Sequence, residues 1–325
     1  MNEIKGISWD FWDTLIAHKN KAEVKLVDET RTAFLSDLFK ISLEEAWREL
    51  KDHFPEEDGD FAQGVTVEKR IEYLAKKYNT NLNIKDISQK FSAISVKHDI
   101  GLVSGVKKAL EEIDFRSVSI CNTKWTKGDD LRKLMEKNDI IRFFENCYFS
   151  DIGSYAKPSI KAFETAWKKS INLEETLHIG DNLAKDIKGA KNIGAKSIVC
   201  RVVKNTPDIK DEIADAVIYD YAGLSALIYS IMGKVLDEKW DIIGKGTPYS
   251  NIKRIASRCG NEIGNVMVGD ITPQNQVSAI ISNKNNQQEN IPGIYDFDGD
   301  IKKISEKSLV MIDFTRGLVF KKWEK

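Results

Sequence analysis

The chain has 325 residues, of which 42% are hydrophobic and 30% are charged. Its 49 lysines and arginines nearly balance its 50 aspartates and glutamates, so the formal net charge is −1. This balance excludes a global electrostatic attraction to nucleic acid or to an anionic membrane surface. The composition is that of a globular protein long enough for two domains with hydrophobic cores.

The N-terminal residues show no signal peptide, and no apolar run approaches the roughly 18 residues that a membrane span needs. We therefore expect a cytoplasmic protein without a membrane partner. The cysteines are widely spaced and form no C-x-x-C pair, which argues against both a zinc site and a disulfide framework. We expect buried thiols at these four positions: Cys121, Cys147, Cys200 and Cys259.

The first residues predict a buried strand that ends in an acid. Residues 4–9 are mostly apolar and run directly into Asp10 and the segment 11–15, with sequence FWDTL. Such a run is typical of a central strand of a parallel sheet, and in doubly wound folds ligands bind at the carboxyl edge of the strands. Taken alone, the pattern fits a turn former or a helix N-cap at Asp10 better than a catalytic acid.

Residues 16–100 are predicted to form helices joined by polar turns. The sequence around Ser42 and Glu45 predicts a capping box, and Trp47 and Leu50 fall on one face of the amphipathic helix that follows. A second helical stripe runs through residues 67–78. The insertion of about 85 residues is far longer than the dozen or so that a crossover connection needs. We therefore expect an inserted helical cap at 16–100.

From residue 101 onward, predicted strands alternate with predicted helices. The strands are expected over 116–123, 148–150, 177–181, 196–199 and 216–218, and the helices over 106–113, 129–137, 159–170, 186–192 and 224–231. This alternation predicts right-handed βαβ units and a parallel sheet. The expected fold is α/β, with a Rossmann-like doubly wound parallel sheet as the core domain, formed by residues 1–15 and 101–232.

The C-terminal region differs in character. Glycines and prolines punctuate a connector, and short strands are expected over 265–269, 277–282, 293–297, 309–314 and 318–323. We expect a small β-rich domain at 240–325. Residues 291–294 and 310–319 weakly resemble the swivelling phosphohistidine domain of phosphoenolpyruvate-using enzymes, but all four histidines precede residue 179. Such a domain would bind or position something, such as a protein partner, without carrying phosphate.

Four features follow one another at the expected strand ends. They are Asp10 with Thr14, Cys121 with Asn122, Lys157-Pro158 with Phe163, and Gly180-Asp181 with Asp186. Their order, with the K-P-x-x-x-x-F and G-D-x-x-x-x-D spacings, resembles the haloacid dehalogenase-like (HAD) hydrolase superfamily over about residues 1–232. The resemblance implies a HAD-like hydrolase, most often a phosphatase, that acts on a small phosphorylated metabolite.

The resemblance also implies the catalytic and metal-binding residues. Asp10 matches the carboxylate nucleophile, because phosphoryl transfer through an aspartyl-phosphate needs such a group. The implied Mg²⁺ ligands are Asp10, the backbone carbonyl of Trp12, Asp181 and, in support from the next helical turn, Asp186. A hard divalent cation is needed there because the carboxylates and the phosphate would otherwise repel one another.

Lys157 matches the residue that neutralises the charge of the nucleophile and the phosphate. Backbone N–H groups after Asp10 and Asn122 would hold the phosphate oxygens. The expected phosphate-binding residues are therefore Phe11, Trp12, Thr14, Cys121 and Asn122. Cys121 stands where Ser or Thr is usual, and a thiol is a poorer hydrogen-bond donor, so a packed core cysteine is the competing interpretation.

Trp12 is the main departure from the phosphatase pattern. The usual motif is D-x-D-x-T, in which the second acid protonates the leaving group and later activates water. Here that position is Trp12, and an acid follows one place later as Asp13. A shift of one residue usually changes the face of a strand. Asp13 is therefore a catalytic candidate, but its proximity in the sequence does not by itself make it a replacement for the missing acid. General acid–base catalysis contributes roughly 10²–10⁴-fold, so its loss would leave a slow phosphatase or a different reaction.

Two alternative functions stay open at this point. Dehalogenases and phosphonatases of the family also lack the second acid, although Gly180-Asp181 favours a metal and counts against the metal-free dehalogenases. Phosphonatase chemistry needs a Schiff-base lysine in the cap, where Lys19, Lys21 and Lys25 lie. The other alternative is a catalytically weak binding protein with this fold.

Overall fold

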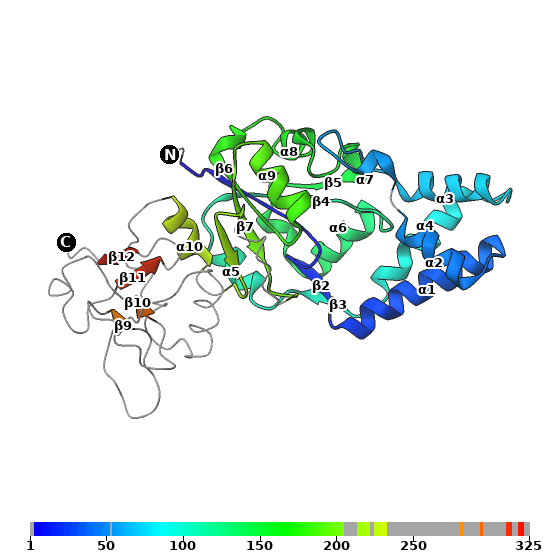
Figure 1. Ribbon diagram of the computed structural model, residues 1–325, viewed down its shortest axis with the longest axis horizontal. Helices are drawn as coiled ribbons and strands as arrows, with labels where there is room; N and C mark the ends of the chain where they lie inside the picture. Colours follow the sequence, from blue (N-terminus) through cyan, green and yellow to red (C-terminus); the bar gives the residue numbers. More distant parts are fainter. Residues whose placement is uncertain are drawn as a thin grey trace, which may run out of the picture. The chain divides into compact units, whose positions relative to one another are not determined.

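The computed structural model describes residues 3–52, 54–204, 213–221 and 224–232, together with the short strands 280–281, 293–294, 310–313 and 318–321 (Figure 1). By its internal contacts the chain divides into two compact units, one formed by Ile4–Val203 and the other by Lys204–Lys325 with Met1–Glu3. Every residue of the site described below belongs to the first unit.

In the unit Ile4–Val203, neighbouring strands have the order β5-β4-β1-β6-β7. They are β1 (Gly6–Trp9), β4 (Arg116–Cys121), β5 (Asn146–Phe149), β6 (Thr176–Gly180) and β7 (Lys196–Cys200). β1 pairs in parallel with both β4 and β6, and the pairs β4–β5 and β6–β7 are parallel as well. The predicted α/β fold with a parallel sheet is confirmed. Because β1 lies in the middle, the residue after it sits between the ends of β4 and β6.

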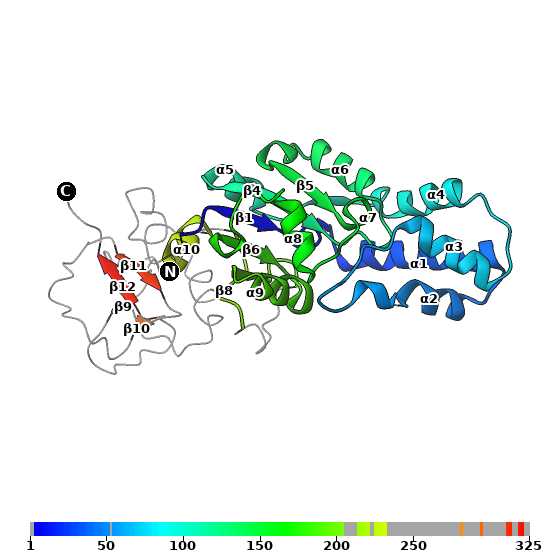
Figure 2. The same cartoon turned by 90° about the horizontal axis from the view of Figure 1, so that it is seen from above.

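Helices cover both faces of this sheet, as Figure 2 shows. They are α5 (Val106–Glu112) and α6 (Gly128–Lys137) on one face, and α8 (Ile160–Ala166) and α9 (Lys188–Asn192) on the other. Side chains alternate along β5, so Tyr148 joins the apolar cluster of α8 and α9, whereas Phe149 packs at Gly128 of α6. Apolar side chains therefore leave both faces of the strands, as expected for a buried parallel sheet.

Four helices lie between two short strands that the sequence analysis missed. The strands β2 (Ile16–His18) and β3 (Ile100–Leu102) pair antiparallel. The helices between them are α1 (Lys21–Phe39), α2 (Leu43–Lys51), α3 (Val67–Lys77) and α4 (Ile84–Val96). Strands of three residues are too short to show an alternating pattern, so only their pairing reveals them.

Ser42 caps the start of α2 as predicted, whereas the Glu45 carboxylate accepts from the Tyr78 hydroxyl at 3.0 Å, and one of the two apolar residues expected on one face of this helix is exposed. The Ser42 hydroxyl accepts a hydrogen bond from the Glu45 N–H at 3.1 Å. Leu50 is buried, whereas Trp47 is 43% exposed and stacks beneath the Lys51 ammonium at 4.4 Å. The indole lies beneath a charged group at the surface, and helical periodicity does not distinguish this position from one in the core.

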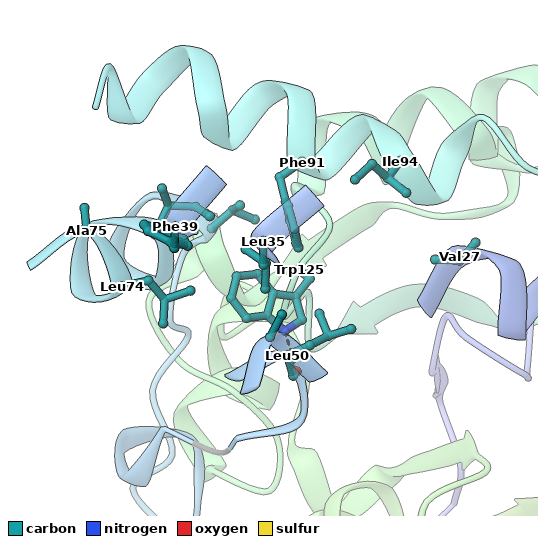
Figure 3. Packing of buried hydrophobic residues seen from close by; sticks show 12 residues of the cluster. Val27, Leu35, Phe39, Leu50, Leu74, Ala75, Phe91, Ile94 and Trp125 are labelled. Carbon is teal, nitrogen blue, oxygen red and sulfur yellow. Dashed lines mark hydrogen bonds between the residues drawn. The ribbon is translucent and has the colours of Figure 1, made fainter. Parts of the chain in front are cut away.

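Trp125 joins the loop after β4 to the helices, and Figure 3 shows its ring inside their hydrophobic cluster. Its ring lies 5.0 Å from that of Phe91, and its Nε1–H donates to the Leu50 carbonyl at 2.9 Å. Arg31 of α1 donates to the Trp125 carbonyl at 3.1 Å and to the Thr126 hydroxyl at 2.9 Å. These contacts hold the helices against one loop of the sheet edge.

Further α-helices and strands are α7 (Ser150–Gly153), β8 (Ala216–Ile218), α10 (Leu224–Ile231), β9 (Ile280–Ile281), β10 (Gly293–Ile294), β11 (Val310–Asp313) and β12 (Leu318–Lys321). The strand expected at 265–269, Cys259 and most of the predicted β-rich domain at 240–325 lie outside the described residues. Cys121, Cys147 and Cys200 are buried free thiols, as predicted. Among the described helices, none combines the length and the apolar character of a bilayer span.

We expect Trp125→Ala to lower the free energy of unfolding by about 3–5 kcal/mol, because it removes a buried aromatic ring and leaves a cavity. The control is Phe61→Ala, since Phe61 is 86% exposed and its removal should change stability by no more than about 0.5 kcal/mol. Urea unfolding followed by circular dichroism measures both. Equal effects of the two substitutions would show that Trp125 does not anchor the helices.

Candidate active site

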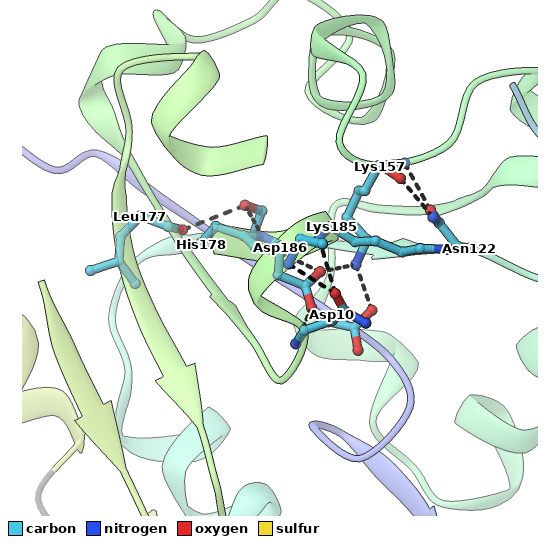
Figure 4. A network of polar contacts seen from close by, with 10 residues as sticks. Asp10, Asn122, Lys157, Leu177, His178, Lys185 and Asp186 are labelled. Carbon is cyan, nitrogen blue, oxygen red and sulfur yellow. Dashed lines mark hydrogen bonds and ion pairs between the residues drawn. The ribbon is translucent and has the colours of Figure 1, made fainter. Parts of the chain in front are cut away.

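Asp10 and Lys157 form the centre of a buried polar network at the carboxyl edge of the sheet (Figure 4). Asp10 follows β1 directly, and its N–H donates to the Ile179 carbonyl of β6 at 2.8 Å. The Lys157 ammonium lies 2.5 Å from Asp10 Oδ1 and 2.6 Å from Asp186 Oδ1. Lys157 is 1% exposed, so this ammonium is almost completely removed from water and is compensated by two carboxylates.

The side chain of Asn122 holds the backbone of Lys157. Its Oδ1 accepts the Lys157 N–H at 2.8 Å, and its Nδ2 donates to the Lys157 carbonyl at 2.9 Å. Asn122 comes directly after β4, so this pair of bonds joins the end of β4 to the loop that carries the lysine. The side-chain amide of Asn122 is thus bound to the Lys157 backbone, and the assignment of Asn122 to phosphate binding stays a prediction.

Three acids meet beside this lysine. Carboxylate oxygens of Asp10, Asp181 and Asp186 lie within 4.8 Å of one another. Asp181 follows β6, and Asp186 belongs to η4 (Leu183–Ile187), a single π-helical turn of the kind often found at functional sites. Asp186 is 1% exposed and accepts the Asn182 N–H at 2.9 Å, so it is not a solvent-facing helix acid.

Gly180 has a steric reason to be a glycine. A Cβ at this position would lie 2.6 Å from both Cβ and Oδ2 of Asp186, which is closer than packed atoms approach. The glycine of the G-D pair therefore makes room for the acid six residues later. The G-D-x-x-x-x-D spacing thus has a packing cause, because the turn returns Asp186 to the strand end.

The electrostatics of the site call for another cation. Burial raises the pKa of Asp10 to about 8, with Lys157 acting against this rise and the neighbouring Asp186 and Asp181 adding to it. Burial would also raise the pKa of Asp186, but Lys157 and His178 outweigh it and hold that pKa well below its usual range. With all three carboxylates ionised, these acids and the ammonium carry a formal charge of −3 + 1 = −2, and a bound cation would favour the ionised form of Asp10. An excess of negative charge on hard oxygen donors fits a divalent ion such as Mg²⁺.

His178 belongs to this network, although the sequence analysis gave it no role. It is completely buried in β6, with Nε2 at 3.1 Å from Asp186 Oδ1 and Nδ1 at 2.8 Å from the Ser8 hydroxyl. Burial lowers the pKa of His178, which favours the neutral ring. The available signal was a histidine inside an apolar strand, since a buried polar group requires a partner.

The predicted phosphate-binding positions differ in whether a side chain or a backbone N–H group could reach a phosphate. The side chains of Phe11, Thr14 and Cys121 are buried, and burial raises the pKa of the Cys121 thiol well above its usual value, which suits a packed core cysteine. The backbone N–H groups of Phe11 and Trp12 donate no hydrogen bond to any described residue. The Thr123 N–H, after Asn122, donates to the Ser150 hydroxyl at 3.1 Å. The loop after Asp10 is therefore the better candidate for holding phosphate oxygens.

A cavity of about 410 Å³ adjoins this loop and reaches beneath the helices. Both Trp12 and Asp13 line it, and the Trp12 ring stacks on His18 with centroids 5.5 Å apart. Asp13 has a φ of 57°, and its N–H donates to the Ile16 carbonyl at 2.9 Å. The alternation of a strand does not apply in such a turn, and both residues border the same cavity.

One arrangement defines a class of hydrolase. A buried aspartate at a strand end faces a lysine and two further acids, and it lies beneath helices that are inserted after the first strand. The family model described as haloacid dehalogenase-like hydrolase matches residues 26–200, which is more than half of the chain. The chain therefore belongs to the haloacid dehalogenase-like hydrolase family, as its motifs indicated.

Two curated relatives carry the name glyceraldehyde 3-phosphate phosphatase. The protein of Pyrococcus abyssi is 28% identical over 204 residues, covering 60% of this chain and 80% of the relative. That of Pyrococcus furiosus is 25% identical over 206 residues, covering 61% and 81%. Among solved structures, a HAD phosphatase from Thermococcus onnurineus aligns with a TM-score of 0.50 and 16% identity, over 69% of this chain and 98% of that one. This last similarity supports the fold.

We expect Gly180→Ala to displace Asp186 and to weaken Mg²⁺ binding by at least about tenfold, as changes that disturb the support of metal ligands do. Gly101→Ala is the matched control, because a Cβ there meets no atom within 4 Å. Isothermal titration calorimetry with MgCl₂ measures both affinities. Parent-like binding by Gly180→Ala would mean that Asp186 is not needed at its observed position.

Proposed function

We propose that this protein is a Mg²⁺-dependent phosphatase that hydrolyses a small phosphorylated metabolite through an aspartyl-phosphate on Asp10. The observation that carries this proposal is the contact between the Lys157 ammonium and Asp10 Oδ1 at the end of the central strand. Because Lys157 binds one carboxylate oxygen, Oδ2 remains as the nucleophile. The family membership supports the same reaction class.

Each step can be assigned to groups of this chain. Asp10 Oδ2 forms a bond to phosphorus while the bond to the leaving-group oxygen breaks, and Lys157 counters the negative charge that gathers there. The Phe11 and Trp12 N–H groups orient the phosphate oxygens. The leaving-group oxygen takes a proton from solvent water, because Trp12 supplies none. Water then attacks phosphorus while the bond from phosphorus to Asp10 Oδ2 breaks, and the proton of that water passes to solvent, which releases phosphate and restores Asp10.

Asp10, Asp181, Asp186 and the Trp12 carbonyl would hold Mg²⁺. The fit rests on the three clustered carboxylates and their excess of negative charge. When bound, the ion supplies charge neutralisation between the carboxylates and the phosphate.

The cavity provides room for the leaving group. Its volume of about 410 Å³ is within the usual range of small-molecule sites, and we propose that residues 16–100 act as its cap. The names of the two Pyrococcus relatives make glyceraldehyde 3-phosphate the first substrate to test. Arg31 and Lys124 line the cavity and are candidate partners for the phosphate of such a metabolite, among lining residues that also include four acids: Asp13, Asp28, Asp52 and Glu57.

The structure gives less support to phosphonatase chemistry. None of the cap lysines Lys19, Lys21 and Lys25 is among the residues that line the cavity. Lys19 instead pairs with Asp99 at 2.9 Å, and Lys25 pairs with Glu29 at 3.5 Å. A Schiff base with a substrate in this cavity would require one of these amines to leave its surface position.

We expect Asp181→Ala to abolish Mg²⁺ binding and phosphatase activity, because it removes one of the three clustered carboxylates. The control is Asp37→Ala, which removes an exposed acid from α1. Calorimetry with MgCl₂ and release of phosphate from glyceraldehyde 3-phosphate measure the two effects. An unchanged Mg²⁺ affinity in Asp181→Ala would refute the metal assignment.

We expect slow hydrolysis by the parent protein, because a tryptophan stands where phosphatases of the family carry their general acid. Trp12→Asp should raise kcat on phosphate monoesters by at least about tenfold if the fold survives. Asp13→Asn should change kcat little, and it is the informative comparison because Asp13 lines the same cavity. A fast parent protein that Asp13→Asn cripples, with no gain from Trp12→Asp, would instead make Asp13 the acid–base residue.

A further inference from the structure

A second layer of buried polar groups lies behind the acids of the site. Ser8 of β1 and His178 of β6 face each other as register partners in the parallel ladder, and both are completely buried. From Ser8 the contacts run through His178 and Asp186 to Lys157 and finally to Asp10. Figure 4 shows the part of this network from His178 to Asp10.

The direction of each hydrogen bond in this layer follows from the chemistry of the groups. An ionised Asp186 can only accept, so His178 Nε2 must carry the proton that it donates to Oδ1. In a neutral ring Nδ1 is then an acceptor, and the Ser8 hydroxyl donates to it at 2.8 Å. The contact with Asp186 therefore selects one tautomer of His178, and the Ser8 hydroxyl, which also lies 3.5 Å from the Leu177 carbonyl, complements it.

These bonds also fix the rotation of the Asp186 carboxylate. Oδ1 accepts from His178 Nε2 at 3.1 Å and contacts the Lys157 ammonium at 2.6 Å, while Oδ2 accepts from the Asn182 N–H at 2.9 Å. The terminal torsion of an aspartate is intrinsically broad, so an unsupported carboxylate would sample other orientations. With three donors around it, Asp186 has one orientation in which all of them are satisfied.

We propose that Ser8 and His178 are positioning residues, which form a buried relay that orients Asp186 and thereby holds the Lys157 ammonium against Asp10 Oδ1. Neither residue is assigned any contact with the substrate or the metal. The expected effect of the relay on kcat rests on the proposed phosphatase function, whereas the orientation of Asp186 by the relay does not. The tautomer of His178 can be measured whether or not the protein is a phosphatase.

The first test is the ¹⁵N spectrum of the histidine rings in the full-length protein, with His178 assigned by its loss in His178→Gln. We expect a ring protonated at Nε2 and unprotonated at Nδ1, and we expect Ser8→Ala to shift the Nδ1 signal. Ser119→Ala is the matched control, because Ser119 is equally buried in β4 and its hydroxyl has no partner in the described structure. A ring protonated at Nδ1, or equal spectra for Ser8→Ala and Ser119→Ala, would overturn the relay.

The second test is kinetic, with para-nitrophenyl phosphate and MgCl₂. Ser8→Ala should lower kcat by about tenfold or more with KM near the parent value, whereas Ser119→Ala should leave both unchanged. Equal kcat values for the two serine variants would contradict the positioning role. If the parent shows no phosphatase activity while the ring has the expected tautomer, the proposed function fails and the relay stands.

Discussion

The buried ammonium of Lys157 is the constraint on which the rest of the site depends. A lysine that is 1% exposed is tolerated only if opposite charges and hydrogen bonds replace its water, and Asp10 and Asp186 provide both. The strand order places its partners, because Asp10 directly follows β1, which lies between β4 and β6. β4 leads to Asn122, and β6 leads to the turn that carries Asp186. The sheet thus collects groups that are far apart in the sequence around one charge.

The same constraint explains the features that surround the acids. Gly180 leaves room for Asp186, the π-helical turn returns that residue to the strand end, and His178 and Ser8 occupy positions that an ordinary parallel sheet would fill with apolar side chains. Each of these departs from the simplest packing. Together they satisfy every oxygen of the Asp186 carboxylate in the dry interior, where an unsatisfied charge is costly.

Much of the fold and the candidate site could be predicted from the sequence, because its signals are local. The strand before Asp10 and the strand that ends at Gly180 are recognisable as apolar runs followed by polar residues. The helix start at Ser42 has a short-range capping motif. What could not be predicted depends on contacts between distant segments. The pairing of β2 with β3, the docking of Trp125 among the helices, and the second role of Asn122 leave no periodic trace. The positions of Trp12 and Asp13 were equally hard to predict from the sequence, because a left-handed backbone at Asp13 sets the turn that brings both residues to one cavity.

The most direct test of the account is to trap the covalent intermediate during turnover. The parent protein would be mixed with glyceraldehyde 3-phosphate and MgCl₂, quenched with acid, reduced with borohydride and mapped by mass spectrometry, because reduction converts an aspartyl-phosphate to homoserine. The account predicts homoserine at position 10 in the parent protein and none in Asp10→Asn. Turnover without this modification, or with the modification at another aspartate, would contradict the claim that Asp10 is the nucleophile.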